Sequence, residues 1–166
     1  ALSQPVYDLV ARITGVKDPY ARQKRETNAA ALALLPSLER RIRRAADPLK
    51  AAIHLAVAGN IIDLGIGHAF DLKRDVADLM GRPFAIDHFR EFRRELKPGR
   101  RLLYLGDNCG EIVFDRVFVE YLLACGVAVT FVVKSAPIIN DATLSDAREV
   151  GLTDLCPVIT TGSNDI

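Results

Sequence analysis

The spacing of hydrophobic positions changes along the chain, and the change divides it into two parts. Through the first hundred residues they recur at helical spacing, in segments separated by glycines and by two Asp-Pro pairs, each an N-cap followed by a helix-starting proline. We predict helices over about 5–14, 20–45, 48–59, 71–80 and 87–96. Pro36 should end or kink the second of them, and Asp87 should cap the last.

After Lys97-Pro98-Gly99-Arg100, short apolar strands alternate with helices. We predict strands at 102–105, 127–133 and 156–160, and helices at 111–124 and from about Thr143, where a capping box begins. The middle strand is apolar without alternation, as expected of a strand covered on both faces. Crossovers of this length predict right-handed parallel βαβ units. The predicted fold is α/β: an all-helical subdomain (1–97) followed by a Rossmann-like, three-layer parallel sheet domain (98–166).

The ends of the sequence bear on how complete this domain is. The chain begins at Ala1 and stops at Ile166, directly after a turn-like TTGSNDI stretch that would ordinarily lead into another helix. We therefore expect a fragment whose sheet domain is incomplete at its C-terminus and whose active site could be partial.

Composition and charge exclude several classes of function. The chain has 166 residues, is 49% hydrophobic and 26% charged, and carries a net charge of +1, which predicts neither a nucleic-acid binder nor a membrane-surface protein. No apolar run reaches the roughly 18–20 residues that span a bilayer. Cys109, Cys125 and Cys156 are far apart and form no C-x-x-C pair. This spacing argues against disulfides and structural zinc and suits a reducing cytoplasm.

Ligands of open parallel sheets bind outside the carboxyl ends of the strands. The loop after the first predicted strand places Asp107 and Asn108 side by side at a helix N-terminus, with oxygen ligands of the kind that Mg²⁺ or Mn²⁺ prefers. The glycines at 106 and 110 permit a tight turn and leave backbone N–H groups, near Cys109 and Gly110, open to an anion. Helix capping by Asp107 or Asn108 is the alternative interpretation.

The next two loops add charge and polar groups to the same edge. Lys134 stands where a nucleotide-binding Rossmann domain would usually carry an acidic residue, and a cation there suits phosphate. Asn140-Asp141 gives a second amide–carboxylate pair, although Asp141 could instead compensate a helix dipole and Lys134 could be a solvated charge. The third loop, with Ser163, could donate hydrogen bonds to phosphate or form a simple turn.

The helical part offers one polar pair. Asn60 and Asp63 are three residues apart, hence on one helical face, within an apolar stretch where polar groups need partners. Taken alone, the pair is better explained by a helix break with local capping. The histidines at 54, 68 and 88 have no ligand-like spacing. Cys109 lies at a helix N-terminus, which favours the thiolate, but no histidine is placed near it by sequence.

Several of these segments, in collinear order, resemble the domain-of-unknown-function 89 family, the metal-dependent damage-control phosphatases, and its short prokaryotic branch most closely. The segments are TGVKDPY (14–20), DPLKAA (47–52), AGNIIDLG (58–65), GDNCGEIVFD (106–115), VVKSAPIINDAT (132–143) and TTGS (160–163). The resemblance implies a helical subdomain joined to a Rossmann-like domain, with one divalent metal ion (Mn²⁺, Co²⁺, Ni²⁺ or Mg²⁺) between them. It also implies hydrolysis of small phosphate monoesters such as sugar phosphates or damaged metabolites.

The resemblance assigns roles to the polar residues. Asp107, Asn108 and Asp141 match the metal-binding positions, and Lys134 matches a basic position expected to contact phosphate. Asn60 and Asp63 match the Gly-Asn-x-x-Asp motif that lines the cleft. We expect Lys134, Asn60, Ser163 and the turn at Cys109-Gly110 to bind substrate, and Asp63 to orient the water or act as base.

Two other functions remain open at this stage. The LYLGDNCG stretch also resembles the first loop of an S-adenosylmethionine- or nucleotide-binding Rossmann domain, although Lys134 replaces the expected acid. A non-catalytic module that binds a metal or a phosphometabolite would use the same residues. Neither reading involves nucleic acid or a membrane, and the sequence leaves the oligomeric state open.

Overall fold

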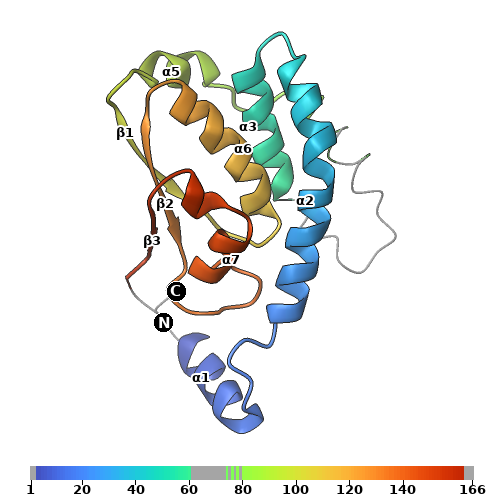
Figure 1. Cartoon of the computed structure of the whole chain (residues 1–166), viewed down its shortest axis with the longest axis vertical. Helices are drawn as coiled ribbons and strands as arrows, with labels where there is room; N and C mark the ends of the chain where they lie inside the picture. Colours follow the sequence, from blue (N-terminus) through green and yellow to red (C-terminus); the bar gives the residue numbers. More distant parts are fainter. Residues whose placement is uncertain (1–2, 61–73, 75, 77, 79, 163–166) are drawn as a thin grey trace.

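The computed structural model describes residues 3–60, 74, 76, 78 and 80–162. A helical part precedes a part in which strands and helices alternate, as the hydrophobic spacing predicts (Figure 1). The helices are α1 (Ser3–Thr14), α2 (Ala21–Arg43), α3 (Pro48–Gly59), α5 (Phe89–Glu95), α6 (Glu111–Ala124) and α7 (Leu144–Glu149). The strands are β1 (Arg101–Leu105), β2 (Ala128–Val133) and β3 (Val158–Thr160). Most of the predicted 71–80 helix lies outside the described residues.

The helix boundaries follow local chemistry. Asp47 accepts a hydrogen bond from Lys50 N (3.2 Å) and precedes Pro48 at the first position of α3. Thr143 and Asp146 form the predicted capping box of α7. Pro36 does not end α2, which continues to Arg43. The predicted 87–96 helix begins later, at Phe89, whose N–H donates to Asp87 (2.9 Å).

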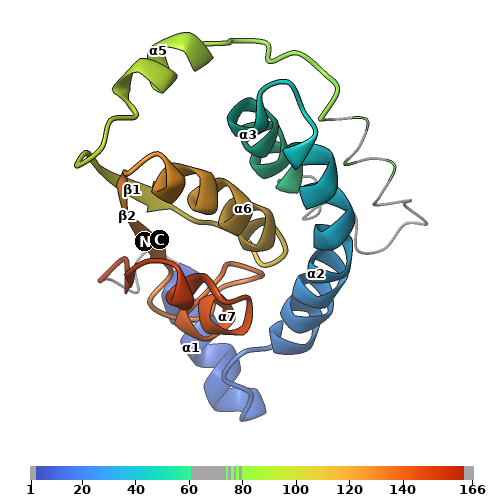
Figure 2. The same cartoon turned by 45° about the horizontal axis from the view of Figure 1, so that its top comes forward.

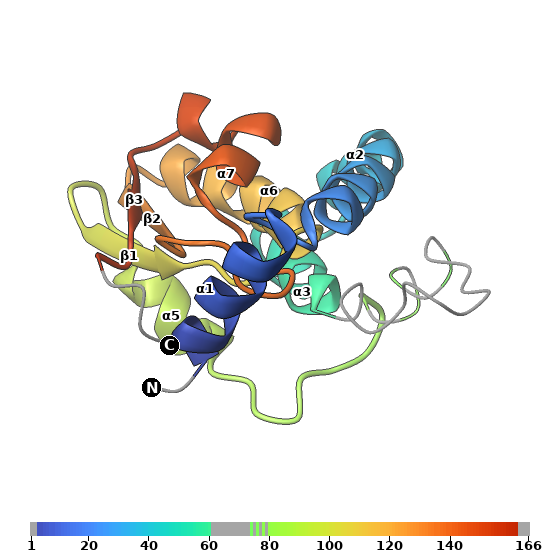
Figure 3. The ribbon, with the colours of Figure 1, turned by 90° about the horizontal axis from the view of Figure 1, so that it is seen from below.

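The sheet is parallel, in the order β1-β2-β3. Its register pairs Leu105 with Val132 and Val132 with Ile159, so these three side chains share one face. Helices α6 and α7 lie over the opposite face (Figures 1 and 3). On the first face Leu105 and Ile159 are exposed, as is Leu103 two residues along β1. The predicted Rossmann-like α/β class is confirmed, with helices of the N-terminal part packed beside it.

Helix α6 lies at the centre of the molecule, between the sheet and the α2–α3 pair (Figure 2). Its side chains are buried on almost every side, with Ile112, Val113, Phe114 and Val119 fully enclosed. Burial of such side chains is worth about 1.5–3 kcal/mol each. One core therefore joins the helical part to the sheet, and the division into domains at residues 97 and 98 stays a prediction.

Helix α1 lies at one end of the molecule, below α7, and is nearest the viewer when the molecule is seen from below (Figure 3). A hydrogen bond from Ile139 N to the Tyr7 hydroxyl (3.3 Å) links it to the loop after β2. None of the described helices has the length and apolar character needed to cross a bilayer.

Candidate functional site

The loops after β1 and β2 are joined to each other by backbone pairing. Asn108 and Asp141 form an antiparallel bridge. Two hydrogen bonds flank it, from Cys109 N to Asn140 O (2.9 Å) and from Ala142 N to Asp107 O (2.7 Å). Asn108 and Asp141 are therefore a non-hydrogen-bonded pair, the kind in which side chains lie closest and point to the same side. The structure thus brings together two residues 33 positions apart in sequence.

Lys134 also reaches this edge of the sheet. Its Nζ lies 3.3 Å from Asp141 Oδ2, and its N–H donates to Ala142 O (2.9 Å). The Lys134 side chain is 28% exposed, so its ammonium is accessible while it neutralises Asp141. The sequence prediction that Lys134 stands beside the acidic loops agrees with this arrangement.

Glu111, which the sequence analysis did not select, belongs to the same cluster. Its carboxylate accepts hydrogen bonds from Asn60 Nδ2 (3.4 Å) and from Asn108. Burial, and then the negative charge of Asp107, raise the pKa of Glu111, while those hydrogen bonds oppose the shift. Glu111 therefore connects α3 to the loop after β1. The available signal was its place in the first turn of a helix that follows Asp107-Asn108.

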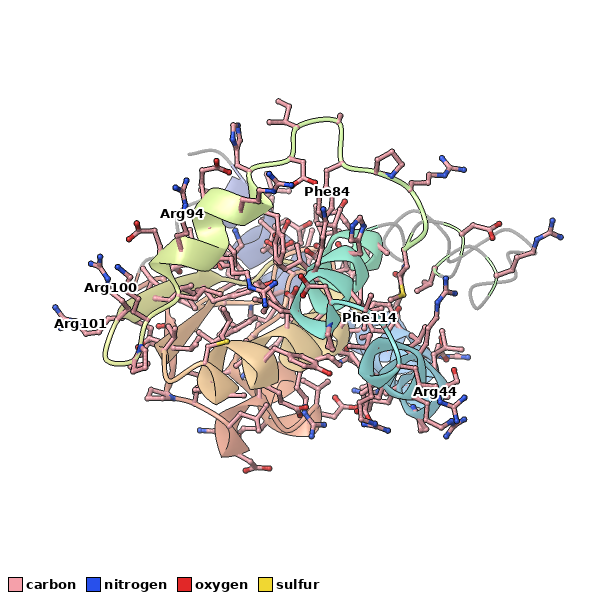
Figure 4. All side chains as sticks on the ribbon, turned by 90° about the horizontal axis from the view of Figure 1, so that it is seen from above. Arg44, Phe84, Arg94, Arg100, Arg101 and Phe114 are labelled. Carbon is pink, nitrogen blue, oxygen red and sulfur yellow. The ribbon has the colours of Figure 1, made fainter. Side chains whose placement is uncertain are left out.

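A pocket of about 520 Å³ opens beside Glu111, between α3 and α6. Its polar lining comes from Asn60, Glu111, Tyr104 and Asp115, and its apolar lining from Ile53, Ala56, Val57 and Phe118. Arg94 of α5 and the pair Arg100 and Arg101, just before and at the start of β1, project outward at the edge of the molecule that lies away from α3 (Figure 4). Arg101 begins β1, so it lies at the amino end of the strand whose carboxyl end carries Asp107. A half-apolar pocket beside an acidic cluster suits the organic part of a small ligand.

The turn at Cys109-Gly110 has a different role in the structure from the one its sequence suggested. The N–H of Cys109 donates to Asn140, and that of Gly110 donates to Asn28 Oδ1 (2.7 Å). Gly110 has φ +87°, which favours glycine. The Cys109 side chain is 1% exposed. Both N–H groups thus hold the loop itself, and substrate binding by this turn stays a prediction.

Of the remaining predicted residues, the structure describes Asn60 but not Asp63 or Ser163. Asn60 lies at the end of α3 and bonds Glu111. Just before Ser163, Gly162 N donates to Ser135 Oγ (3.0 Å), which lies 3.0 Å from Thr161 Oγ1. The third loop therefore contacts the loop that carries Lys134.

The chemistry of the predicted ligand set fits a hard divalent cation. Asp107, Asn108 and Asp141 offer only oxygen ligands, two of them carboxylates. Within the described residues, no three His, Cys, Asp or Glu side chains group closely enough to hold a metal ion. The predicted set therefore needs an oxygen ligand besides its two carboxylates, and the amide of Asn108 offers one. Lys134 is the cation within ion-pair distance of Asp141.

Sequence comparison places the chain in a family. The family described as "Damage-control phosphatase ARMT1-like domain" matches residues 2–166. The chain belongs to that family. The predicted resemblance is confirmed.

Two archaeal damage-control phosphatases are among its relatives. The protein from Pyrococcus horikoshii is 31% identical over 154 residues, which cover 92% of this chain and 53% of the relative. The protein from Archaeoglobus fulgidus is 34% identical over 151 residues, which cover 89% and 52%. An uncharacterized protein of Methanocaldococcus jannaschii is 34% identical over 167 residues, which cover 97% and 55%. The chain thus spans about half the length of these curated relatives.

The fold of this family member also matches a solved structure. The crystal structure of a DUF89 family protein from Pyrococcus horikoshii superposes with a TM-score of 0.83 at 29% sequence identity. The match covers 97% of this chain and 56% of the other. The arrangement of helices and parallel sheet is therefore that of the family.

Proposed function

We propose that this chain carries the metal- and phosphate-binding part of a divalent-metal-dependent phosphatase that hydrolyses small phosphate monoesters, such as sugar phosphates or damaged phosphometabolites. The observation that carries the proposal is the pairing of Asn108 with Asp141, with Lys134 Nζ 3.3 Å from the Asp141 carboxylate. Oxygen ligands and a cation meet where parallel sheets bind ligands. The names of the curated relatives from Pyrococcus horikoshii and Archaeoglobus fulgidus support the reaction class.

Asp107, Asn108 and Asp141 would hold one divalent cation, with Mn²⁺, Co²⁺, Ni²⁺ and Mg²⁺ as candidates. When bound, such a cation offsets the negative charge that develops on a phosphoryl oxygen. The side chains contribute charge as well as ligand atoms: Asp107 raises the pKa of Glu111, so negative charge is concentrated here. A dication would relieve that repulsion.

Lys134 would bind the phosphoryl group. Its ammonium is a compact point charge with three donors, which suits phosphate oxygens. In the structure it already lies within ion-pair distance of Asp141. A phosphate bound at the cation could therefore share Lys134 with Asp141 through a charge-assisted hydrogen bond.

The helical side would position the rest of the substrate. Asn60 is held by Glu111 at the mouth of the pocket between α3 and α6. Asn60 would contact the substrate there, and Ser163 would add a hydrogen bond from the third loop. Asp63 would orient the attacking water or accept its proton, as the family resemblance implies.

The proposal is tested by titrating the chain with Mn²⁺ in a calorimeter and assaying p-nitrophenyl phosphate and sugar phosphates with and without the metal. We expect a single divalent-cation site that is lost in Asp107→Asn and in Asp141→Asn. A chain that binds no divalent cation would sink the proposal. Metal binding that never supports hydrolysis would favour a binding module, and metal-independent binding of S-adenosylmethionine would favour a nucleotide-type site.

A further inference from the structure

The buried face of α2 changes its chemistry along the helix. From Ala31 to Ile42 it is apolar and packs in the core. One to two turns earlier, the same face carries Lys24 and Asn28, which are 2% and 0% exposed. These two residues are four apart and so lie on one side of the helix. A buried ammonium and a buried amide are costly without partners, so their contacts show what this end of α2 does.

Asn28 contacts the loop after β1. Its Oδ1 accepts the hydrogen bond from Gly110 N at 2.7 Å, deep in the protein. Gly110 lies between the predicted metal ligand Asn108 and the first residue of α6. Asn28 Nδ2, by contrast, has no hydrogen-bond partner within the part of the chain that is described. The contact that Asn28 makes is therefore with the backbone of the site loop.

Lys24 contacts the segment that follows Asp141. Its Nζ lies 2.8 Å from Asp146 Oδ2 and 3.1 Å from Asp18 Oδ2. The same Asp146 oxygen accepts hydrogen bonds from Thr143 N (2.8 Å) and Thr143 Oγ1 (2.6 Å). Thr143 is two residues after Asp141 and pairs with Lys134 through a backbone bridge. Lys24 thus holds the Asp146 carboxylate in place, and Thr143, just after the Asp141 loop, is hydrogen-bonded to that carboxylate.

The two contacts converge on one assembly. Burial raises the pKa of the Cys109 thiol, beside Gly110, and the nearby negative charge of Asp146 raises that pKa further. The N-terminal half of α2 lies alongside α7, where Asp146 is located (Figures 1 and 2). A single helix face therefore reaches both loops that carry the predicted metal ligands.

We propose that Lys24 and Asn28 are positioning residues, which hold the Asp107-Asn108 loop and the Asp141 loop at the spacing that their oxygen ligands need. Neither side chain would touch the phosphate. This inference rests on the proposed function, because it concerns the predicted metal ligands of the same site. Displacement by about 1 Å can cost 10²-fold in rate, and partners behind metal ligands are typically worth about 10–100-fold in metal affinity.

The first test is amide hydrogen exchange, measured by NMR on the whole chain. Asn28→Ala should accelerate exchange at least tenfold at Gly110 and Cys109, while Lys24→Gln should do so at Thr143. Amides in the middle of α6 and in β2 should keep their rates. Thr27→Val is the matched control, because Thr27 is buried on the same turn and its hydroxyl donates to Gln23 O of its own helix. If one variant fails to fold, the other still tests its own loop.

The second readout is Mn²⁺ affinity by calorimetry. Asn28→Ala should weaken it at least tenfold, Thr27→Val should leave it within twofold, and Asn28→Asp, which keeps an acceptor for Gly110 N, should restore it. Loop exchange equal to that of Thr27→Val, or uniform acceleration at every amide, would overturn the positioning role. Absence of Mn²⁺ binding in the unmodified chain would instead overturn the proposed function, and the exchange contrast would still decide the positioning role.

Discussion

The hydroxyl of Tyr104 donates a hydrogen bond to Asp115 Oδ1 at 2.6 Å, inside the interface between β1 and α6. Asp115 is 2% exposed. Burial raises the pKa of Asp115 well above its ordinary value of 3.8, against the stabilising hydrogen bond from Tyr104. The negative charges of Glu111 and Asp107 raise it further. An acidic site loop is thus backed by a buried carboxyl group whose pKa the fold raises.

This relationship predicts a specific pH dependence of stability. Because the folded-state pKa of Asp115 is raised, its contribution to stability is complete below about pH 3.8 and is lost as the pH rises through the raised pKa. Asp115→Asn cannot ionise and keeps an acceptor for Tyr104. As the pH rises, the free energy of unfolding of the variant should therefore increase relative to that of the unmodified chain, by up to about 1.4 kcal/mol per pH unit. Urea unfolding of both proteins from pH 5 to 9 measures the difference, and parallel stability curves would contradict the assignment.

Close packing at Gly106 gives a second prediction. A Cβ built there would lie 2.3 Å from Phe131 Cε1 and 2.5 Å from Cζ. The Phe131 ring is fully buried and stacked on Tyr104, with 5.0 Å between centroids, so it has no room to move. Gly106→Ala should cost about 2–3 kcal/mol of unfolding free energy.

Gly59→Ala is the matched control for that substitution. Its Cβ would meet Phe114 Cδ2 at 3.2 Å. Alanine is the better helix former by roughly 0.5–1 kcal/mol in the middle of a helix, and by less at Gly59, the last residue of α3. We expect a net change within about 1 kcal/mol of zero. Equal losses of unfolding free energy in Gly106→Ala and Gly59→Ala would show that contact with Phe131 is not what excludes a side chain at Gly106.

Much of the fold could be predicted because its signals are local. Asp47-Pro48 and the Thr143–Asp146 capping box start helices through contacts within a few residues. Continuous apolar runs indicated the buried parallel strand β2. The extent of α2 was harder, because tertiary packing keeps the helix intact through Pro36. The exposure of Leu103 and Leu105 could not be predicted, because it depends on what covers that face of the sheet.

Residues of the candidate site could be predicted only where they lie in a loop that directly follows a strand in the sequence. The rule that ligands bind at the carboxyl ends of parallel strands placed Asp107, Asn108, Lys134 and Asp141 at one edge, and the bridge between Asn108 and Asp141 agrees. The contacts of Lys24 and Asn28 could not be predicted, because each resembles an ordinary polar residue of a charged helix. Their importance comes from partners 82 positions or more away, at Gly110 and Asp146. No local pattern reports such contacts.

The three cysteines should differ in reactivity. Burial, and then the charge of Asp146, raise the pKa of the Cys109 thiol, and burial also raises that of Cys156. Cys125 is only partly buried. Brief treatment of the native chain with iodoacetamide, followed by peptide mass spectrometry, should label Cys125 at least tenfold faster than Cys109. Comparable labelling of Cys109 would contradict its burial and reopen a nucleophilic role.

Lys134→Met should have opposite effects on two ligands. Lys134 and Asp141 form a partly exposed ion pair, with side chains 28% and 16% exposed, so the loss of stability should stay below about 1 kcal/mol. Removing the ammonium frees the Asp141 carboxylate from a competing cation, which should tighten Mn²⁺ binding several-fold. The same change removes the proposed phosphate contact, so inorganic phosphate should bind the Mn²⁺-loaded chain at least tenfold more weakly.

Calorimetric titration of Mn²⁺, and then of phosphate into the Mn²⁺-loaded chain, measures both effects in one preparation. Lys97→Met is the control, because Lys97 is exposed and precedes β1, away from the carboxyl ends of the strands. The opposite signs are the decisive feature: a general loss of structure would weaken both ligands, and a general loss of positive charge would tighten the metal in the control as well. If phosphate affinity were unchanged while Mn²⁺ binding tightened, Lys134 would be a counter-ion of Asp141 and not a phosphate ligand.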